Sequence, residues 1–392
     1  MNLSLVGLPV LVLFVVGAIG FSLLALFGGR AAATSGRSRA VTLTIRTTAL
    51  ILSQVMVVAL AADLVNRHYM FFVSWGDLFG TAKVTGVAQQ SGSTSPLVVK
   101  NSHPQSPGNI RGTGRGPQSN SPWPKISHVY PLSPTGWGRV DMVLTGQQSG
   151  ITGQLEVLLP PHWTPTPARA YPVIEVLPGF PGTFTTMTGA FGVRAMIENA
   201  VDQHKLHDAI IVSVTDHGAR DSECINSQLG QWATWLAHDI PNWLAAHVGA
   251  TTDPAARVTL GFSMGGWCAN MLTVKYPNVF GGSISMGGYT APAFQSPNPL
   301  PRTPQMMATY DIAHILFTNP PPVRMWMQTD ALDQVSYPAT AHFLAHKVMS
   351  PAAVTVYLTT GVGHNFRVIQ YFMPPALVWL THAMPAFSPL AP

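Results

Sequence analysis

The residues best suited to do chemistry in this sequence lie at 261–265 and read Gly-Phe-Ser-Met-Gly. A serine hydroxyl is a weak nucleophile, so it needs an exposed position, an adjacent base and donors for the developing oxyanion. An apolar run ends at Leu260 and a helical pattern follows the pentapeptide, which is typical of a strand, a sharp turn and a helix that expose a nucleophile. We therefore predict that Ser263 is a nucleophile.

A base and an acid are expected later in the chain, because this motif is followed first by the acid and then by the histidine. Among the 14 histidines, His364 is the predicted base because it follows a strand-like run at 354–358 and a Gly-Val-Gly turn. Asp330 and Asp333 both follow the strand-like run at 323–328. Their spacing alone leaves either one as the carboxylate that orients the imidazole.

Two backbone N–H groups are the expected donors for the oxyanion. One belongs to Met264, the residue after the nucleophile, and the other to the loop after the strand-like run at 171–177. In that loop Pro178 and Pro181 have no N–H to donate. Phe180 is therefore the predicted second donor.

Strand-like and helical runs alternate in the part of the chain that must position these residues. The runs at 140–145 and 154–159 are typical of an antiparallel pair, and five nearly continuous apolar runs predict buried parallel strands. The five are 171–177, 209–214, 257–261, 323–328 and 354–358, and helical patterns fall at 231–247, 267–275 and 337–348. Such alternation predicts an α/β-hydrolase fold with a mostly parallel, doubly wound sheet.

The beginning of the chain is much more apolar than an ordinary soluble enzyme. Charged residues are only 9% of the chain and the mean hydropathy is +0.23. Residues 3–27 carry no charge, which is long enough to cross a bilayer core, and residues 47–64 form a second apolar run. We predict two transmembrane helices; a signal peptide followed by an apolar soluble helix is the alternative.

The basic residues near these runs predict the orientation of the chain. Arg30, Arg37 and Arg39 lie between the two runs, and the positive-inside bias puts that loop in the cytoplasm. The remainder of the chain is then extracytoplasmic. The net charge of +5 and the pI near 9.3 suit anionic lipid or cell-wall polymer, and since the sequence has no nucleic-acid motif we expect no nucleic-acid partner.

The predicted organisation has three parts. Residues 1–66 are a membrane anchor, 67–137 a juxtamembrane segment and linker rich in Ser, Gly and Pro, and 138–392 an esterase domain. The linker is expected to separate the anchor from the catalytic domain.

The two cysteines and a group of acidic residues each have two interpretations. Cys224 and Cys268 predict one disulfide in an oxidising compartment, with a pair of buried free thiols as the alternative. Asp216, Asp221 and Glu223 favour loop caps over a cation site or a part of the acyl pocket. No metal and no cofactor is expected.

Several motifs resemble a known family. Residues 171–180, 261–265 and 363–366 resemble the putative-esterase family, which includes esterase D and the mycobacterial antigen 85 mycolyltransferases. Residues 220–224, 265–268 and 333–338 look like membrane-anchored actinobacterial esterases of that family. The last of these motifs favours Asp333 over Asp330 as the acid.

Together these features predict a membrane-anchored, extracytoplasmic serine esterase or acyltransferase that acts on lipid or glycan esters of the envelope. Two other functions use the same features: a catalytically silent envelope-binding protein that keeps the fold, and a peptidase with the same triad. The motifs do not separate hydrolysis from acyl transfer, because the two differ only in the acceptor, and they leave the oligomeric state open.

Overall fold

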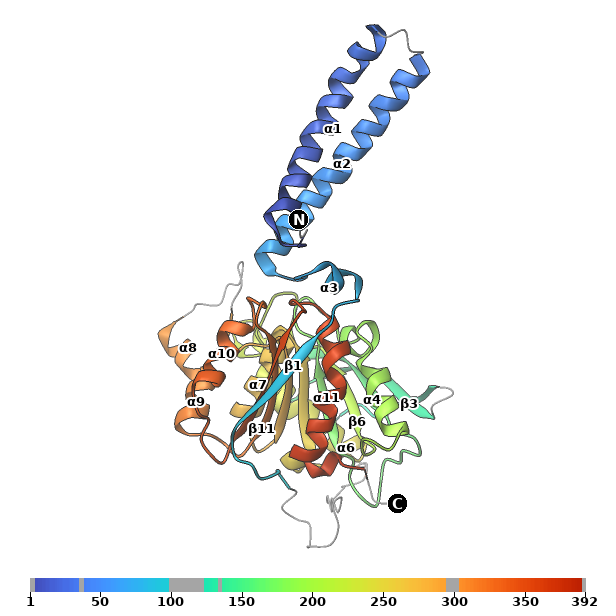
Figure 1. Cartoon of the computed structure of the whole chain (residues 1–392). Helices are drawn as coiled ribbons and strands as arrows, with labels where there is room; N and C mark the ends of the chain where they lie inside the picture. The colour runs from blue at the N-terminus through green and yellow to red at the C-terminus, as the bar shows by residue number, and fades with distance from the viewer. Residues whose placement is uncertain (1–3, 35–38, 99–122, 133–135, 294–302, 390–392) are drawn as a thin grey trace. The chain divides into compact units, whose positions relative to one another are not determined.

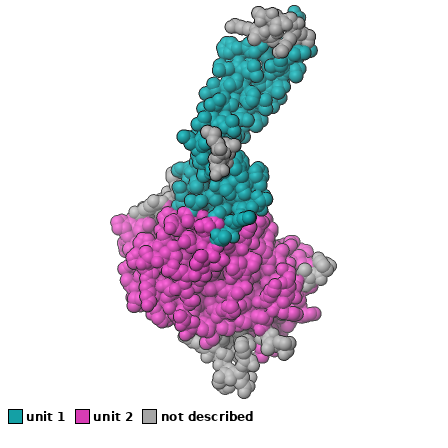
Figure 2. Space-filling view, viewed as in Figure 1, with its two compact units in different colours: residues 1–85, 332–334, 361–365 teal, residues 86–331, 335–360, 366–392 magenta. Residues whose placement is uncertain are grey.

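A computed structural model of the chain describes residues 4–34, 39–98, 123–132, 136–293 and 303–389. Its contacts divide the chain into two compact units (Figure 2). Unit 1 comprises Met1–Thr85, Leu332–Gln334 and Gly361–Asn365, and unit 2 comprises Gly86–Ala331, Val335–Thr360 and Phe366–Pro392.

Unit 1 begins with a hairpin of two long helices, α1 (Leu8–Thr34) and α2 (Arg39–Tyr69). The guanidinium group of Arg67 donates hydrogen bonds to the carbonyl oxygens of Val6 at 2.7 Å and Gly7 at 3.0 Å. Since Arg67 is in the last turn of α2, the two helices run antiparallel (Figure 1).

Both helices are long and apolar enough to cross a membrane, over Leu8–Gly28 and Arg39–Tyr69. They coincide with the runs predicted at 3–27 and 47–64, and α2 extends beyond its run at both ends. Many apolar side chains of the hairpin are exposed, including Val16, Leu26, Leu43 and Val58. The loop predicted to face the cytoplasm includes residues 35–38, which lie outside the described residues.

A short helix, α3 (Trp75–Phe79), follows the hairpin in unit 1. The Ser74 hydroxyl accepts a hydrogen bond from the N–H of Asp77 at 3.0 Å, which caps the start of α3. Gly80, with φ of 76°, ends the helix in the left-handed conformation that glycine adopts without strain.

Unit 2 is built on a sheet that has ten strands among the described residues, in the order β1-β12-β11-β10-β9-β5-β6-β4-β3-β2. The strands from β12 to β6 are parallel to one another, whereas β4, β3 and β2 continue the sheet in antiparallel pairs. The predicted mostly parallel sheet is thus confirmed. The bounds are β1 (Thr85–Gly92), β2 (Tyr130–Leu132), β3 (Trp137–Thr145), β4 (Thr152–Leu159), β5 (Val173–Leu177), β6 (Ile210–Val214), β9 (Arg257–Phe262), β10 (Gly282–Met286), β11 (Arg324–Asp330) and β12 (Ala353–Thr360).

Helices cover both faces of this sheet. As a result β5, β6, β10 and β11 are buried at every residue. Helix α7 packs against β5, β9 and β10, while α4 and α11 contact each other (Figure 1). The helices are α4 (Val193–Asp202), α5 (Trp232–Thr234), α6 (Ile240–His247), α7 (Met264–Lys275), α8 (Pro304–Thr309), α9 (Ile312–Thr318), α10 (Tyr337–Ala345) and α11 (Arg367–Ala383); β7 (Asn226–Ser227) and β8 (Gly230–Gln231) form a separate small hairpin.

The edge strands β1 and β2 lie within residues 67–137, the range expected to be a juxtamembrane segment and linker. Their side chains are mostly exposed. Such strands have no alternation of apolar residues for a sequence pattern to detect. Residues 99–122 of the expected linker lie outside the described residues.

Candidate active site

Ser263 lies at the turn between β9 and α7, as the motif predicts. Its φ of 56° and ψ of −122° are unusual for a residue with a side chain, and such a backbone costs about 1–3 kcal/mol. The N–H of Ser263 donates to the carbonyl oxygen of Met286 at 2.9 Å, which helps to hold the turn against β10. This turn places the half-buried Ser263 at the end of a central strand.

The outer glycines of the motif allow this turn to close. A Cβ at Gly261 would overlap the backbone of Gly265, and a Cβ at Gly265 would overlap the carbonyl oxygen of Leu177 at the end of β5. A larger residue at either position would push the turn open. These two glycines therefore serve the close approach of β9, α7 and the end of β5.

The loop after β5 lies directly against the serine turn. Gly179 has φ of 75°, and a Cβ there would lie 2.7 Å from the nitrogen of Gly265 and 2.9 Å from the carbonyl oxygen of Phe262. Met264 is the first residue of α7, so its N–H is one of the donors that a helix start leaves without an intrahelical partner. The loop that contains Phe180, the other predicted donor, is thus next to the serine turn.

Asp216 holds this loop, a role that the sequence did not reveal. Its buried carboxylate accepts a hydrogen bond from the N–H of Gly179 at 3.0 Å. Burial raises the pKa of Asp216 to about 6, and the neighbouring His217 and the Gly179 hydrogen bond oppose that rise. Its place two residues after β6, which pairs with β5, is the signal that puts it beside the loop.

His217 contacts the same loop from the side. Its ring lies edge-on to the ring of Phe180, with 5.0 Å between centroids. Its Nε2 is 2.9 Å from the carbonyl oxygen of Gly182. Asp216 and His217 together fix the backbone on both sides of Phe180.

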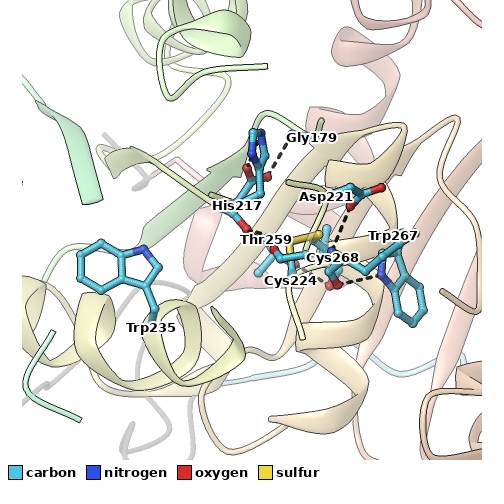
Figure 3. The surroundings of a disulfide bond; sticks show 12 residues. Gly179, His217, Asp221, Cys224, Trp235, Thr259, Trp267 and Cys268 are labelled. Carbon is cyan, nitrogen blue, oxygen red and sulfur yellow. Dashed lines mark hydrogen bonds and ion pairs between the residues drawn. A yellow bond between two sulfur atoms is a disulfide. The ribbon is translucent and has the colours of Figure 1, made fainter. Parts of the chain in front are cut away.

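Cys224 and Cys268 form a disulfide that joins the loop after β6 to α7 (Figure 3). The linked Cys268 lies on α7, five residues after Ser263, which is the N-cap of that helix. The disulfide therefore ties the helix that follows Ser263 to the loop after β6.

The acidic residues beside the disulfide are occupied as hydrogen-bond acceptors. The Glu223 carboxylate accepts from the Tyr289 hydroxyl and from the N–H of Ala293, each at 2.9 Å. The Asp221 carboxylate accepts from the N–H of Glu223 at 3.0 Å, which is a local loop cap (Figure 3). Asp221 is thus a loop cap, whereas Glu223 joins its loop to Tyr289 and Ala293.

In unit 1 the structure brings His364 and Asp333 together. His364 Nδ1 is 2.9 Å from Asp333 Oδ2, and both side chains are buried. Asp330, in contrast, is the last residue of β11, and its Oδ2 accepts from the Thr359 hydroxyl at 3.2 Å. The carboxylate that faces the imidazole is therefore that of Asp333.

A further residue that the sequence did not single out contacts the loop of His364. Asp77, in α3, is fully buried and accepts a hydrogen bond from the N–H of Gly363 at 2.8 Å. The two residues are 286 positions apart, and no pattern within either segment relates them.

Parts of this sequence are similar to known proteins. The family model described as "Putative esterase" matches residues 150–370. An uncharacterized protein of Corynebacterium glutamicum is 24% identical over 136 residues, which cover 34% of this chain and 32% of that protein. The MPT51/MPB51 antigen of Mycobacterium tuberculosis is 35% identical over 68 residues, 17% of this chain and 22% of the antigen. The chain thus matches a third or less of the length of these relatives.

Solved structures show the same fold at low sequence identity. An S-formylglutathione hydrolase from Agrobacterium tumefaciens matches with a TM-score of 0.53 and 13% identity, over 67% of this chain and 100% of that one. A ferulic acid esterase matches with a TM-score of 0.50 and 14% identity, over 63% of this chain and 98% of that one. At such identities the likeness establishes the fold, which is that of the α/β hydrolases.

Proposed function

We propose, from the premise that this chain belongs to the putative esterase family, that it cleaves carboxylic esters through a covalent acyl-enzyme on Ser263. The observation that carries this proposal is the strained backbone of Ser263 at the end of β9, with φ of 56°. A strained turn of this kind is a cost to folding that an exposed nucleophile explains.

In the proposed mechanism His364, Asp333 and Ser263 act as one triad. Nε2 of His364 takes the proton from the serine hydroxyl as its oxygen attacks the ester carbonyl carbon. Asp333, held at Nδ1, fixes the imidazole and stabilises the imidazolium that forms. The imidazolium then gives its proton to the leaving alcohol, which leaves the acyl group on the serine oxygen.

The oxyanion of the tetrahedral intermediate is proposed to accept hydrogen bonds from the N–H groups of Met264 and Phe180. Removing one such donor typically costs about 3 kcal/mol of transition-state stabilisation. The close packing of Gly179 on the serine turn supports the assignment, because it brings the loop of Phe180 next to the start of α7.

The acyl group leaves when water or an acceptor hydroxyl attacks it, with His364 now acting as the base. Water gives an esterase and an alcohol acceptor gives an acyltransferase. We propose that the substrates are lipid or glycan esters of the cell envelope, because residues 1–66 are proposed to anchor the catalytic domain, residues 138–392, at the outer face of the membrane.

Two features support this location. The hairpin of α1 and α2 is long and apolar enough to span a membrane. The disulfide between Cys224 and Cys268 is typical of an oxidising compartment. Protease added to intact spheroplasts should therefore degrade a C-terminal tag, whereas protection of the tag until the membrane is lysed would contradict an extracytoplasmic domain.

The catalytic proposal is tested by labelling the full-length protein with a fluorophosphonate probe, which reacts with activated serines. We expect one probe per chain, attached at Ser263, and no labelling of the Ser263→Ala variant. An unlabelled wild type beside a serine esterase that reacts, or equal labelling of both forms, would remove Ser263 from the mechanism. The first result would favour a catalytically silent envelope-binding protein.

A further inference from the structure

We propose that residues 70–73, which directly follow α2, form together with Asp77 a positioning element for His364, with Asp77 as its central residue. This inference rests on the proposed function, in which His364 is the base. It gives the start of the chain a part in catalysis in addition to membrane attachment.

The first observation is that the backbone of this segment binds the loop of His364. The N–H of His364 donates to the carbonyl oxygen of Met70 at 3.0 Å. The side-chain amide of Asn365 donates to the carbonyl oxygen of Phe71 at 2.6 Å. A Cβ at Gly363 would overlap both of these carbonyl oxygens, so the glycine before the base is fitted to the segment.

The second observation is that the carboxylate of Asp77 bridges the two residues that flank His364. Its Oδ2 accepts from the N–H of Gly363 at 2.8 Å, and its Oδ1 accepts from the Asn365 amide at 3.1 Å. Oδ2 also accepts from the N–H of Val73 at 3.0 Å. Hydrogen bonds to a charged acceptor are stronger than neutral ones, and Asp77 is fully buried.

The third observation is that the segment is itself fixed to the end of α2. The side chain of Asn66 accepts from the N–H of Phe72 at 2.7 Å and donates to its carbonyl oxygen at 2.8 Å. Met70 turns the chain out of the helix with φ of 52°. These hydrogen bonds join the segment to the last turn of α2.

These contacts act on the position of the imidazole without touching the reacting atoms. The Asp333 carboxylate holds the ring at Nδ1, but the backbone that bears the ring is held by Met70, Phe71 and Asp77. A misplacement of a catalytic group by about 1 Å can cost about 100-fold in rate. Asp77 is therefore a positioning residue, and its loss should lower kcat more than it changes KM.

The test uses full-length protein in detergent, with a short-chain p-nitrophenyl ester as substrate. Asp77→Ala should lower kcat by about 100-fold and change KM by less than about threefold. Asp77→Asn keeps an oxygen for the N–H of Gly363 but points an amide at Asn365, so kcat should fall by only about tenfold. The rate of fluorophosphonate labelling should fall in parallel with kcat.

Ser74→Ala is the matched control, because it removes the cap of the same helix without removing any contact to the loop of His364. We expect its kcat to stay within about threefold of the wild type. Asn365→Ala provides a second route to the same contact should Asp77→Ala fail to fold. Its kcat should fall by about tenfold at a temperature where the variant is still folded.

Folded Asp77→Ala with wild-type kcat would overturn the inference, as would equal losses in Asp77→Ala and Ser74→Ala. If Asp77→Ala does not fold, wild-type kcat in both Asp77→Asn and Asn365→Ala would overturn it. Each of these outcomes is separate from failure of the proposed function, because in that case the wild type itself would remain unlabelled by the fluorophosphonate.

Discussion

Ser263 is held by residues of its own motif and of adjoining strands, whereas the loop of His364 is held by residues 286 to 294 positions earlier in the chain. The serine turn depends on Gly261, Gly265 and a backbone hydrogen bond to Met286. The histidine loop depends on Asp77 and the carbonyl oxygens of Met70 and Phe71. The backbone of Ser263 is thus held by neighbouring segments, whereas the loop of His364, residues 361–366, is held by residues that are far away in the sequence.

This difference predicts which changes in the sequence affect catalysis. Ser263, the proposed nucleophile, belongs to unit 2, whereas His364, the proposed base, belongs to unit 1 together with the helical hairpin. In the proposed enzyme the base is supported by a segment that starts directly after the second long helix, which ends at Tyr69. We infer that changes near this helix end affect catalysis, whereas changes in the edge strand β2 do not.

The largest effect on kcat is expected from replacing Asp333, the proposed acid that contacts His364. Asp333→Asn removes the charge that fixes the imidazole tautomer, and the corresponding change in a serine protease lowers kcat by about 10⁴-fold. Asp330→Asn is the matched control, since Asp330 is bound to Thr359, and we expect at most a few-fold loss. Steady-state kinetics on a p-nitrophenyl ester measures both, and the opposite ranking would return Asp330 to the triad.

The next largest effect on kcat is expected from replacing Gly179, which packs against the turn of Ser263. Gly179→Ala puts a side chain at φ of 75° and within 2.7 Å of the Gly265 nitrogen. The loop must shift, which should displace the predicted donor Phe180 and lower kcat by about 10²- to 10³-fold. Gly150→Ala is a control with φ of 68° and no heavy atom within 4 Å of the added Cβ, so it should keep kcat. Equal kinetics for the two variants would contradict the local account of the serine turn.

The two regions also differ in how far the sequence could predict them. The strand, turn and helix around Ser263 follow from contiguous residues, and most parallel strands were found because their apolar runs are nearly continuous. Strand β10 was missed because Ser283 and Ser285 interrupt its apolar residues, although both are buried. Helix α11 was missed because Pro374 and Pro375 lie inside it.

The support of the base could not be predicted for a different reason. Asp77 lies between a serine N-cap and a glycine C-cap, a pattern that is common to short helices. This pattern does not indicate a contact with His364. Contacts between residues so far apart depend on the completed fold. Asp216 is intermediate, since its place after β6 indicates the correct edge of the sheet but not its partner Gly179.

Removal of the disulfide tests how much of the nucleophile region depends on covalent support. The bond closes a loop with a sequence separation of 44 residues, so the Cys224→Ser/Cys268→Ser variant should lose about 4 kcal/mol of stability on the chain-entropy estimate. Denaturant unfolding measures this loss. Below the unfolding transition we expect kcat within about threefold of the wild type, because glycine contacts and backbone hydrogen bonds still fix the turn. A much larger fall in kcat would show that the disulfide itself positions Ser263.

The smallest effect is expected in the pH dependence. Burial raises the pKa of Asp216 to about 6, so its carboxylate gains a proton as the pH falls through that value. A neutral carboxyl accepts the Gly179 hydrogen bond more weakly, so kcat/KM of the wild type should fall as the pH drops through the pKa of Asp216. The amide oxygen of the Asp216→Asn variant accepts a hydrogen bond at every pH. At pH 5, relative to its own maximum, the kcat/KM of this variant should therefore fall up to about tenfold less than that of the wild type. Identical acid limbs would exclude Asp216 from the control of the loop.

The acyl-enzyme itself tests the central claim most directly. After rapid mixing of the full-length protein with p-nitrophenyl acetate, the mass of the quenched protein and of its peptides reports any acyl group and its position. We predict a transient acetyl group on Ser263, formed together with one equivalent of p-nitrophenol, and none in Ser263→Ala. Turnover of the ester with no acyl group on Ser263, or with the acyl group on another residue, would contradict the account.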